Sequence, residues 1–102
     1  MHVISRKKLK LFWKIHKDAE SPLRTWYKIT DKAEWQTTHD VKDCFGRRVD
    51  QVEQFTVFDI GGNKYRLIAV IDFRRQKVFV RHVLTHREYD DDKWRDDSFR
   101  IR

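Results

Sequence analysis

Residues 65–84 read YRLIAVIDFRRQKVFVRHVL, and this stretch decides the fold. Side chains on a strand point to alternate sides, so the apolar row that begins with Tyr65, Leu67 and Ala69 lies on one face of an extended chain. The dipeptide Arg74–Arg75 interrupts the alternation, and strand-forming residues resume immediately after it. The pattern therefore predicts an antiparallel hairpin with a two-residue turn and one apolar face.

Two neighbouring segments extend this hairpin into a sheet. Residues 55–60, FTVFDI, are rich in strand-forming residues, and the Gly61–Gly62 pair that follows them is typical of a tight turn. The sequence thus predicts a three-stranded antiparallel meander. His2–Ile4 is a short strand candidate that can add to one edge of this meander.

The front of the chain shows helical rather than alternating spacing. Ser5 is a good N-cap, and the segment after it places one apolar stripe at i, i+3, i+4 and i+7: Leu9, Phe12, Trp13 and His16. Ser21–Pro22 restarts the chain, because proline fits the first position of a helix. Helical spacing then continues as far as Trp35. The two segments together predict a helical hairpin.

Helices followed by a meander predict an α+β fold in which the two N-terminal helices pack on one face of a small antiparallel sheet. The length of the chain predicts that residues 1–102 form a single domain. Residues 91–102 show no clear period and are a candidate for a loose tail, where an exposed Trp94 would indicate a partner contact. The sheet face away from the helices is expected to be open and functional.

Composition narrows the classes of function. Lys and Arg number 23 against 16 Asp and Glu, and the net charge of +7 favours a polyanionic or acidic partner. The single cysteine, Cys44, excludes an internal disulfide and a multi-cysteine zinc site, and it fits a reducing cytoplasm. The longest apolar run, Leu67–Ile71, is too short to cross a membrane, and we expect no export signal. Nucleotide-binding glycine motifs and metal motifs are absent from the sequence, so we expect no cofactor and no metal.

Two arginines of the hairpin are candidates for phosphate binding. If Arg74–Arg75 is a two-residue turn, Ile68 lies opposite Arg81 and Arg66 lies opposite Val83. Both arginines then project from the face away from the helices, where a guanidinium group can grip a phosphate bidentately. The alternative is that both pair with acidic side chains on a solvated sheet face.

The segment THREYD, residues 85–90, brings together groups suited to acid–base chemistry on a phosphodiester. Histidine, here His86, exchanges protons near neutral pH, and Tyr89 can donate a hydrogen bond or a proton. Arg87 can neutralise charge that develops on a phosphate. The alternative is an ordinary polar loop that Thr85 caps.

Four blocks of the sequence resemble one known family. MHVIS at residues 1–5, DAESPL at 18–23, GNKYRL at 62–67 and THREYD at 85–90 are similar, in order and spacing, to the HigB toxins of the RelE-like superfamily of type II toxin–antitoxin systems. The resemblance implies a compact α+β ribonuclease that cleaves messenger RNA, typically on the ribosome. It also implies a HigA-like helix-turn-helix antitoxin that neutralises the toxin in a hetero-oligomer and represses the operon together with it.

The resemblance assigns catalysis to Arg66, His86 and Tyr89. The leading hypothesis is a cytoplasmic, metal-independent endoribonuclease toxin that uses the RNA 2′-hydroxyl as nucleophile and leaves a 2′,3′-cyclic phosphate and a 5′-hydroxyl. RNA phosphates would be held by five basic residues: Lys64, Arg81, Arg87, Arg47 and Arg48. Two alternatives stay open, a non-catalytic RNA- or DNA-binding module and a protein-interaction domain whose basic surface meets an acidic partner.

Overall fold

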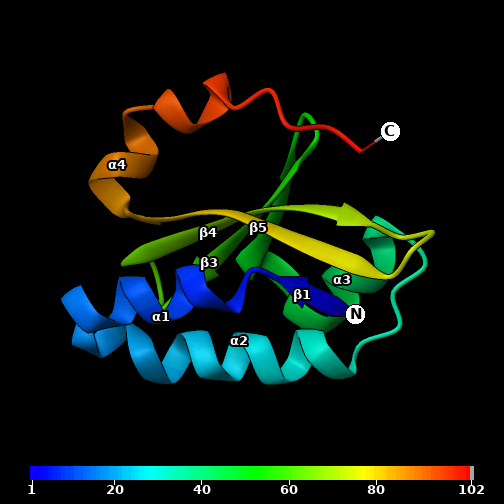
Figure 1. Cartoon of the computed structure of the whole chain (residues 1–102), viewed down its shortest axis with the longest axis horizontal. Coiled ribbons are helices and arrows are strands. Elements are labelled where there is room, and N and C mark those ends of the chain that lie inside the picture. The colour runs from blue at the N-terminus through cyan, green and yellow to red at the C-terminus, as the bar shows by residue number, and fades with distance from the viewer. Residues whose placement is uncertain (102) are drawn as a thin grey trace.

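A five-stranded sheet organises the chain in the computed structural model, which describes residues 1–101 (Figure 1). The strand order is β1-β5-β4-β3-β2. The strands are β1 (His2–Ile4), β2 (Val49–Val52), β3 (Phe55–Ile60), β4 (Tyr65–Asp72) and β5 (Lys77–Thr85). The predicted α+β class and the N-terminal edge strand are confirmed. However, β1 pairs parallel with β5, so the sheet is mixed and not purely antiparallel as expected.

Four α-helices and three short 3-10 helices accompany the sheet within residues 1–101. The α-helices are α1 (Arg6–Ile15), α2 (Glu20–Lys32), α3 (Thr38–Phe45) and α4 (His86–Asp90), and the 3-10 helices are η1 (Lys17–Ala19), η2 (Gly46–Arg48) and η3 (Lys93–Asp96). Ser5 caps α1 as predicted, because its hydroxyl accepts a hydrogen bond from the Lys7 amide at 3.2 Å. Within residues 1–101, no helix combines the length and the apolar character needed to cross a bilayer.

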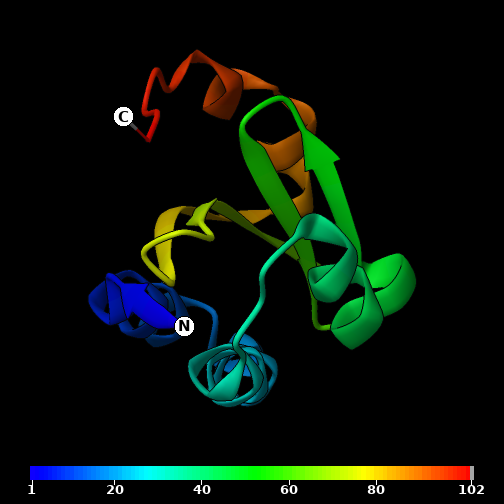
Figure 2. The same cartoon turned by 90° about the vertical axis from the view of Figure 1, so that its right-hand side faces the viewer.

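The larger core lies between α1, α2 and the sheet. Leu9 of α1 and Trp26 of α2 are buried in one cluster with Phe58 and Leu67 of the sheet. The apolar row that was predicted from the hairpin, Tyr65, Leu67, Ala69 and Ile71, belongs to this cluster. Figures 1 and 2 show both helices on the same side of the sheet, below it in these views.

The sequence prediction missed two elements between residues 37 and 52. Thr37 and Asp40 form a capping box that starts α3. β2 then pairs antiparallel with β3 and makes the meander four-stranded. β2 lacked a clear signal because it is an edge strand with Asp50 and Gln51 exposed at its centre.

The β4–β5 hairpin differs from the prediction in the length of its turn and in its register from Ile68 back to Tyr65. Asp72 pairs with Lys77 across a four-residue connection, so the expected two-residue turn is wrong, although the pairing beside the turn is the expected one. A β-bulge at Arg81 then shifts the register, and Ile68 pairs with His82. Because of this shift, Val83 packs in the core on the helix side and not beside Arg66, as had been expected.

The sheet face opposite the helices is covered and not open. A second core on that face contains Phe55, Val57, Ile68, Val70 and Trp94. Trp94 comes from the C-terminal segment, residues 91–101. In Figure 1 this segment returns across the sheet and lies above it. Trp94 is only 4% exposed, so the exposed indole that would have indicated a partner contact is not found. The physical reason is that two apolar rows alternate on β4, and both need cover.

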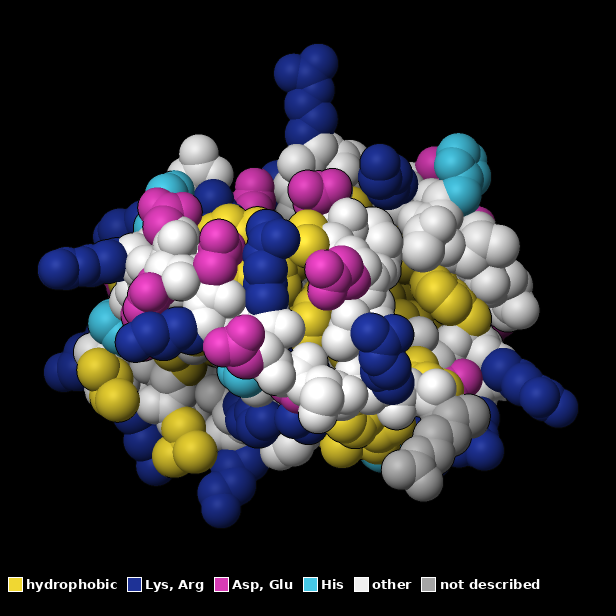
Figure 3. All heavy atoms as spheres, turned by 90° about the horizontal axis from the view of Figure 1, so that it is seen from above, with side chains coloured by type: hydrophobic (Ala, Val, Ile, Leu, Met, Phe, Trp, Pro, Cys, Tyr) yellow, Lys and Arg dark blue, Asp and Glu magenta, His cyan; other side chains and the backbone are white. Residues whose placement is uncertain are grey.

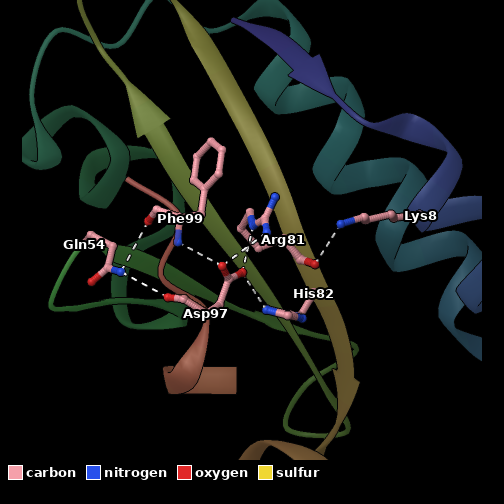
Figure 4. Close-up of polar contacts among 6 residues, drawn as sticks. All are labelled: Lys8, Gln54, Arg81, His82, Asp97 and Phe99. Atoms are coloured by element: carbon pink, nitrogen blue, oxygen red, sulfur yellow. Dashed lines mark hydrogen bonds and ion pairs between the residues drawn. The ribbon is translucent and has the colours of Figure 1, made fainter. Parts of the chain in front are cut away.

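One carboxylate fastens this segment to the sheet. Asp97 accepts hydrogen bonds from Arg81 at 2.8 and 3.1 Å, from Nε2 of His82 at 3.0 Å and from the Phe99 amide at 3.0 Å (Figure 4). Gln54 donates to the backbone carbonyls of Asp97 and Phe99. The hydrogen bonds from Arg81 are the main reason that the pKa of Asp97 falls to about 2. We call this group the Asp97 anchor.

The Asp97 anchor predicts a pH-dependent contribution to stability. The pKa of Asp97 is depressed on folding, so its contribution is fully present above about pH 4 and is lost as the pH falls towards about 2. We expect Asp97→Asn to lower the free energy of unfolding at pH 7 by about 2 kcal/mol, and the difference from wild type to narrow below about pH 4. Urea unfolding between pH 7 and pH 3 measures both. The exposed neighbour Asp96 gives the control, Asp96→Asn, and an equal loss in both variants would contradict the prediction.

Candidate active site

The THREYD segment forms a short helix where β5 ends. Thr85 accepts a hydrogen bond from the Glu88 amide at 3.2 Å, and the Glu88 carboxylate accepts one from the Thr85 amide at 2.9 Å. This capping box starts α4, so the segment is helical and not an irregular loop. The His86 amide also donates to the Lys64 carbonyl at 3.0 Å, which ties the start of α4 to the start of β4.

Arg66 lies beside this helix and is nearly buried. It is 8% exposed, and its Nε forms an ion pair of 3.1 Å with Asp59 on β3. Its Nη1 donates to the carbonyls of Asn63 and Tyr65, each at 3.1 Å. The arginine was expected to face solvent from mid-strand, but it sits near the start of β4 with an acidic partner. Asp59 and Asn63 are contacts that the sequence did not reveal, because neither position carries a periodic signal.

Tyr89 joins Arg66 to the C-terminal segment. The guanidinium carbon of Arg66 lies 5.1 Å from the centre of the Tyr89 ring. The same ring stacks on Trp94 at 5.3 Å with an interplanar angle of 11°. Burial raises the pKa of Tyr89, so its phenol keeps its proton at neutral pH. The sequence grouped Arg66 with Tyr89, and the structure brings the two into contact.

His86 is held by a carboxylate one turn later on α4. Its Nδ1 lies 2.8 Å from Oδ2 of Asp90, and the two side chains are 50% and 60% exposed. With Nδ1–H donated to Asp90, Nε2 is the ring nitrogen that can exchange a proton with a substrate. The sequence prediction did not pair these residues, although i,i+4 spacing on a helix would have indicated the contact.

The predicted RNA-binding residues divide into paired and unpaired groups. Lys64 forms an ion pair with Asp18, which also accepts a hydrogen bond from the Tyr65 hydroxyl at 2.5 Å. The hydrogen bond to Lys64 is the largest cause of a lowered pKa at Asp18, and it raises the pKa of Lys64. Arg81 belongs to the Asp97 anchor. Arg87 is exposed, and among the described residues it forms no ion pair.

Arg47 and Arg48 lie at the same end of the sheet as α4. Both are exposed in η2 directly before β2 begins, and Val49 pairs with Phe58 near the end of β3. Arg48 therefore lines an open hollow together with Asp59, the acidic partner of Arg66. Topology thus gathers the basic residues of η2, the β3–β4 turn and α4 at one end of the sheet.

The charge on this side of the molecule is mixed. Figure 3, which looks down on the C-terminal segment, shows acidic and basic side chains interspersed instead of one continuous basic patch. Within residues 1–101, no three His, Cys, Asp or Glu side chains are grouped closely enough to hold a metal ion. His86, Tyr89 and Arg66 bring groups that can transfer protons and donate hydrogen bonds to this end of the sheet.

Comparison with known proteins gives the class of protein. The sequence model of HigB toxins, described as the RelE-like toxic component of a toxin–antitoxin system, matches residues 19–92. The chain belongs to this family. It is 28% identical over 93 residues to the mRNA interferase HigB of Escherichia coli O6:H1, which covers 88% of this chain and 89% of that protein. It is 29% identical over 92 residues to the mRNA interferase toxin HigB of Escherichia coli strain K12, with 88% of each chain covered.

The Asp59–Arg66 ion pair predicts an unequal response to two matched substitutions. Asp59→Ala leaves a nearly buried guanidinium without its carboxylate, and we expect it to cost roughly 2–4 kcal/mol of unfolding free energy. Glu20→Ala removes the partner of Arg24 in an exposed pair, and this should cost less than about 1 kcal/mol. Chemical unfolding at neutral pH measures both. Equal costs would mean that Arg66 does not depend on Asp59.

Proposed function

We propose that this chain is the toxin of a toxin–antitoxin pair and that it cleaves messenger RNA as a metal-independent endoribonuclease. The observation that carries the proposal is the contact between Arg66 and Tyr89, which lies on the same short helix as the His86–Asp90 pair. Two relatives are named mRNA interferases, and this supports the choice of substrate. We further propose that residues 1–102 act as one RelE/HigB-like ribonuclease domain, with α1 and α2 covering one face of the sheet.

The proposed reaction is an attack of the RNA 2′-hydroxyl on the adjacent phosphorus. The bond from phosphorus to the 5′-oxygen breaks, and the products are a 2′,3′-cyclic phosphate and a 5′-hydroxyl. His86 exchanges a proton through Nε2 as general acid or base. Tyr89 positions the phosphate through its phenol or assists the proton transfer. Arg66 stabilises the charge that develops on the phosphate oxygens.

Substrate binding depends on the basic groups around this end of the sheet. Three of these residues are exposed and can bind RNA phosphates: Arg87, Arg47 and Arg48. Lys64 and Arg81 remain part of the proposed RNA surface, but each already has a carboxylate partner that RNA must compete with. We therefore assign the larger share of RNA binding to the first three residues.

We propose that the protein works in the cytoplasm on translating ribosomes and is neutralised by a HigA-like antitoxin. A groove between α1 and α2 supports a docking place away from α4, and it is lined by Arg6, Trp13, Arg24 and Tyr27. Each arginine lies over an aromatic ring, Arg6 over Tyr27 at 4.5 Å and Arg24 over Trp13 at 4.8 Å. Such a surface suits an antitoxin segment that carries both acidic and apolar side chains.

Substitution of His86 tests catalysis. We expect His86→Ala to lower the rate of messenger cleavage about 100–10,000-fold, because a positioned acid or base is lost, and to abolish growth arrest. His39 also forms an i,i+4 pair with an aspartate, Asp43 on α3, so His39→Ala is the matched control and should cleave at the parent rate. A chelator should leave the wild-type rate unchanged. Parent-rate cleavage by His86→Ala, or inhibition by the chelator, would overturn the assignment.

Salt dependence tests the RNA surface independently of catalysis. On single strands each neutralised phosphate adds about 0.7 to the slope of log affinity against log salt. We expect Arg87→Ala to reduce that slope by about this amount when it is measured with an uncleavable RNA analogue. Arg74 is exposed in the hairpin turn at the far end of β4, so Arg74→Ala should leave the slope unchanged. An affinity that is independent of salt would exclude the electrostatic contribution.

A further inference from the structure

The C-terminal segment contributes a buried tryptophan to the side of the sheet that carries the proposed catalytic groups. Trp94 packs edge-on against Phe55 at 5.5 Å in the second core. It lies beyond residue 92, where the match to the HigB family ends. The catalytic proposal gives it no role.

Trp94 makes two specific contacts with Tyr89. Its ring stacks on the phenol, and its Nε1–H donates to the Tyr89 carbonyl at 3.0 Å. One contact therefore fixes the plane of the Tyr89 ring, and the other fixes the backbone that carries it. Tyr89 belongs to a helix of only five residues, which is too short to hold its side chains rigidly without tertiary packing.

Trp94 is itself held by the Asp97 anchor. The Asp97 amide donates to the Trp94 carbonyl at 3.2 Å, so the two residues share one backbone turn. The carboxylate of Asp97 is then clamped by Arg81 and His82 from the β5 bulge (Figure 4). A continuous path of contacts thus runs from β5 through Asp97 and Trp94 to Tyr89.

The path ends at Arg66, whose guanidinium lies against the Tyr89 ring. We infer that Trp94 is a positioning residue: it holds the Tyr89 phenol against Arg66, and the Asp97 anchor holds Trp94 in place. The inference rests on the proposed function, because it assigns Tyr89 and Arg66 to catalysis. Its structural half, that Trp94 sets the position of Tyr89, is testable without any cleavage assay.

The test compares substitutions at two buried tryptophans. In Trp94→Leu the stacking and the indole donor are lost, and we expect kcat for RNA cleavage to fall about 100-fold while KM changes less than about threefold. Trp94→Phe keeps an aromatic ring and should recover most of kcat. Trp35 is also buried and bonded through Nε1, to the Cys44 sulfur, but it belongs to the other core. Trp35→Leu is therefore the matched control, with reduced stability and unchanged kcat.

A spectroscopic measurement separates positioning from catalysis. Burial raises the pKa of Tyr89, and with Trp94→Leu this pKa should fall towards its ordinary value. NMR titration of protein with ring-labelled tyrosine measures this pKa. The Tyr89 signal is identified as the one missing from the spectrum of Tyr89→Phe. Trp35→Leu should leave the signal in place. Asp97→Asn keeps the indole and weakens only its anchor, so it should move the Tyr89 signal in the same direction even if Trp94→Leu fails to fold.

The outcomes distinguish the inference from the proposed function. A shifted Tyr89 signal with a reduced kcat supports both. If wild-type protein cleaves no RNA, the proposed function fails, and the Tyr89 signal still decides whether Trp94 positions this ring. An unmoved Tyr89 signal in folded Trp94→Leu, or in Asp97→Asn, overturns the inference. An unchanged kcat in folded Trp94→Leu overturns it as well.

Discussion

Arg81 is an extra residue in β5 that has no partner on β4. The cover on the sheet face away from the helices depends on the bulge that this residue forms. A bulge turns two successive side chains towards one face, so Arg81 and His82 both reach the same carboxylate. Burial lowers the pKa of His82, which leaves a neutral imidazole to donate beside the charged guanidinium. In a regular strand one of these two side chains would point into the opposite core, and Asp97 would lose a donor.

The Asp97 anchor fastens the C-terminal segment that covers the second side of the sheet. All eight residues of β4 are buried, which is unusual for a small antiparallel sheet, since such sheets commonly leave one face to solvent. The helices cover the row that contains Leu67, and the C-terminal segment covers the row that contains Ile68. Arg66 belongs to the second row. Its burial follows from the cover above it, and Asp59 and two backbone carbonyls compensate its charge.

The partners of the individual charged side chains say more about the functional hypotheses than the net charge of +7 does. Two of the five basic residues first grouped as an RNA surface, Lys64 and Arg81, already have carboxylate partners. Arg66 and Arg81 both pair with acidic side chains, which was the alternative to phosphate binding considered for them. Arg81 serves the fold. Arg66 is paired with an acid, yet it also touches Tyr89, at the end of the sheet where α4 begins. A buried arginine in contact with a protonated phenol is a more specific arrangement than a solvated basic face.

The sequence by itself determined the features that depend on neighbours along the chain. These include the Ser5 cap, the two N-terminal helices, the strands of the central hairpin, the α+β class and the motifs that resemble HigB toxins. Alternation and capping involve residues only a few positions apart, so their signals can be read directly. Only the tertiary structure decided the bulge at Arg81, the pairing of Asp59 with Arg66, and the return of Asp97 to a strand 16 residues earlier. Those contacts form between segments that packing brings together, and no periodic pattern encodes which partner a buried charge will meet.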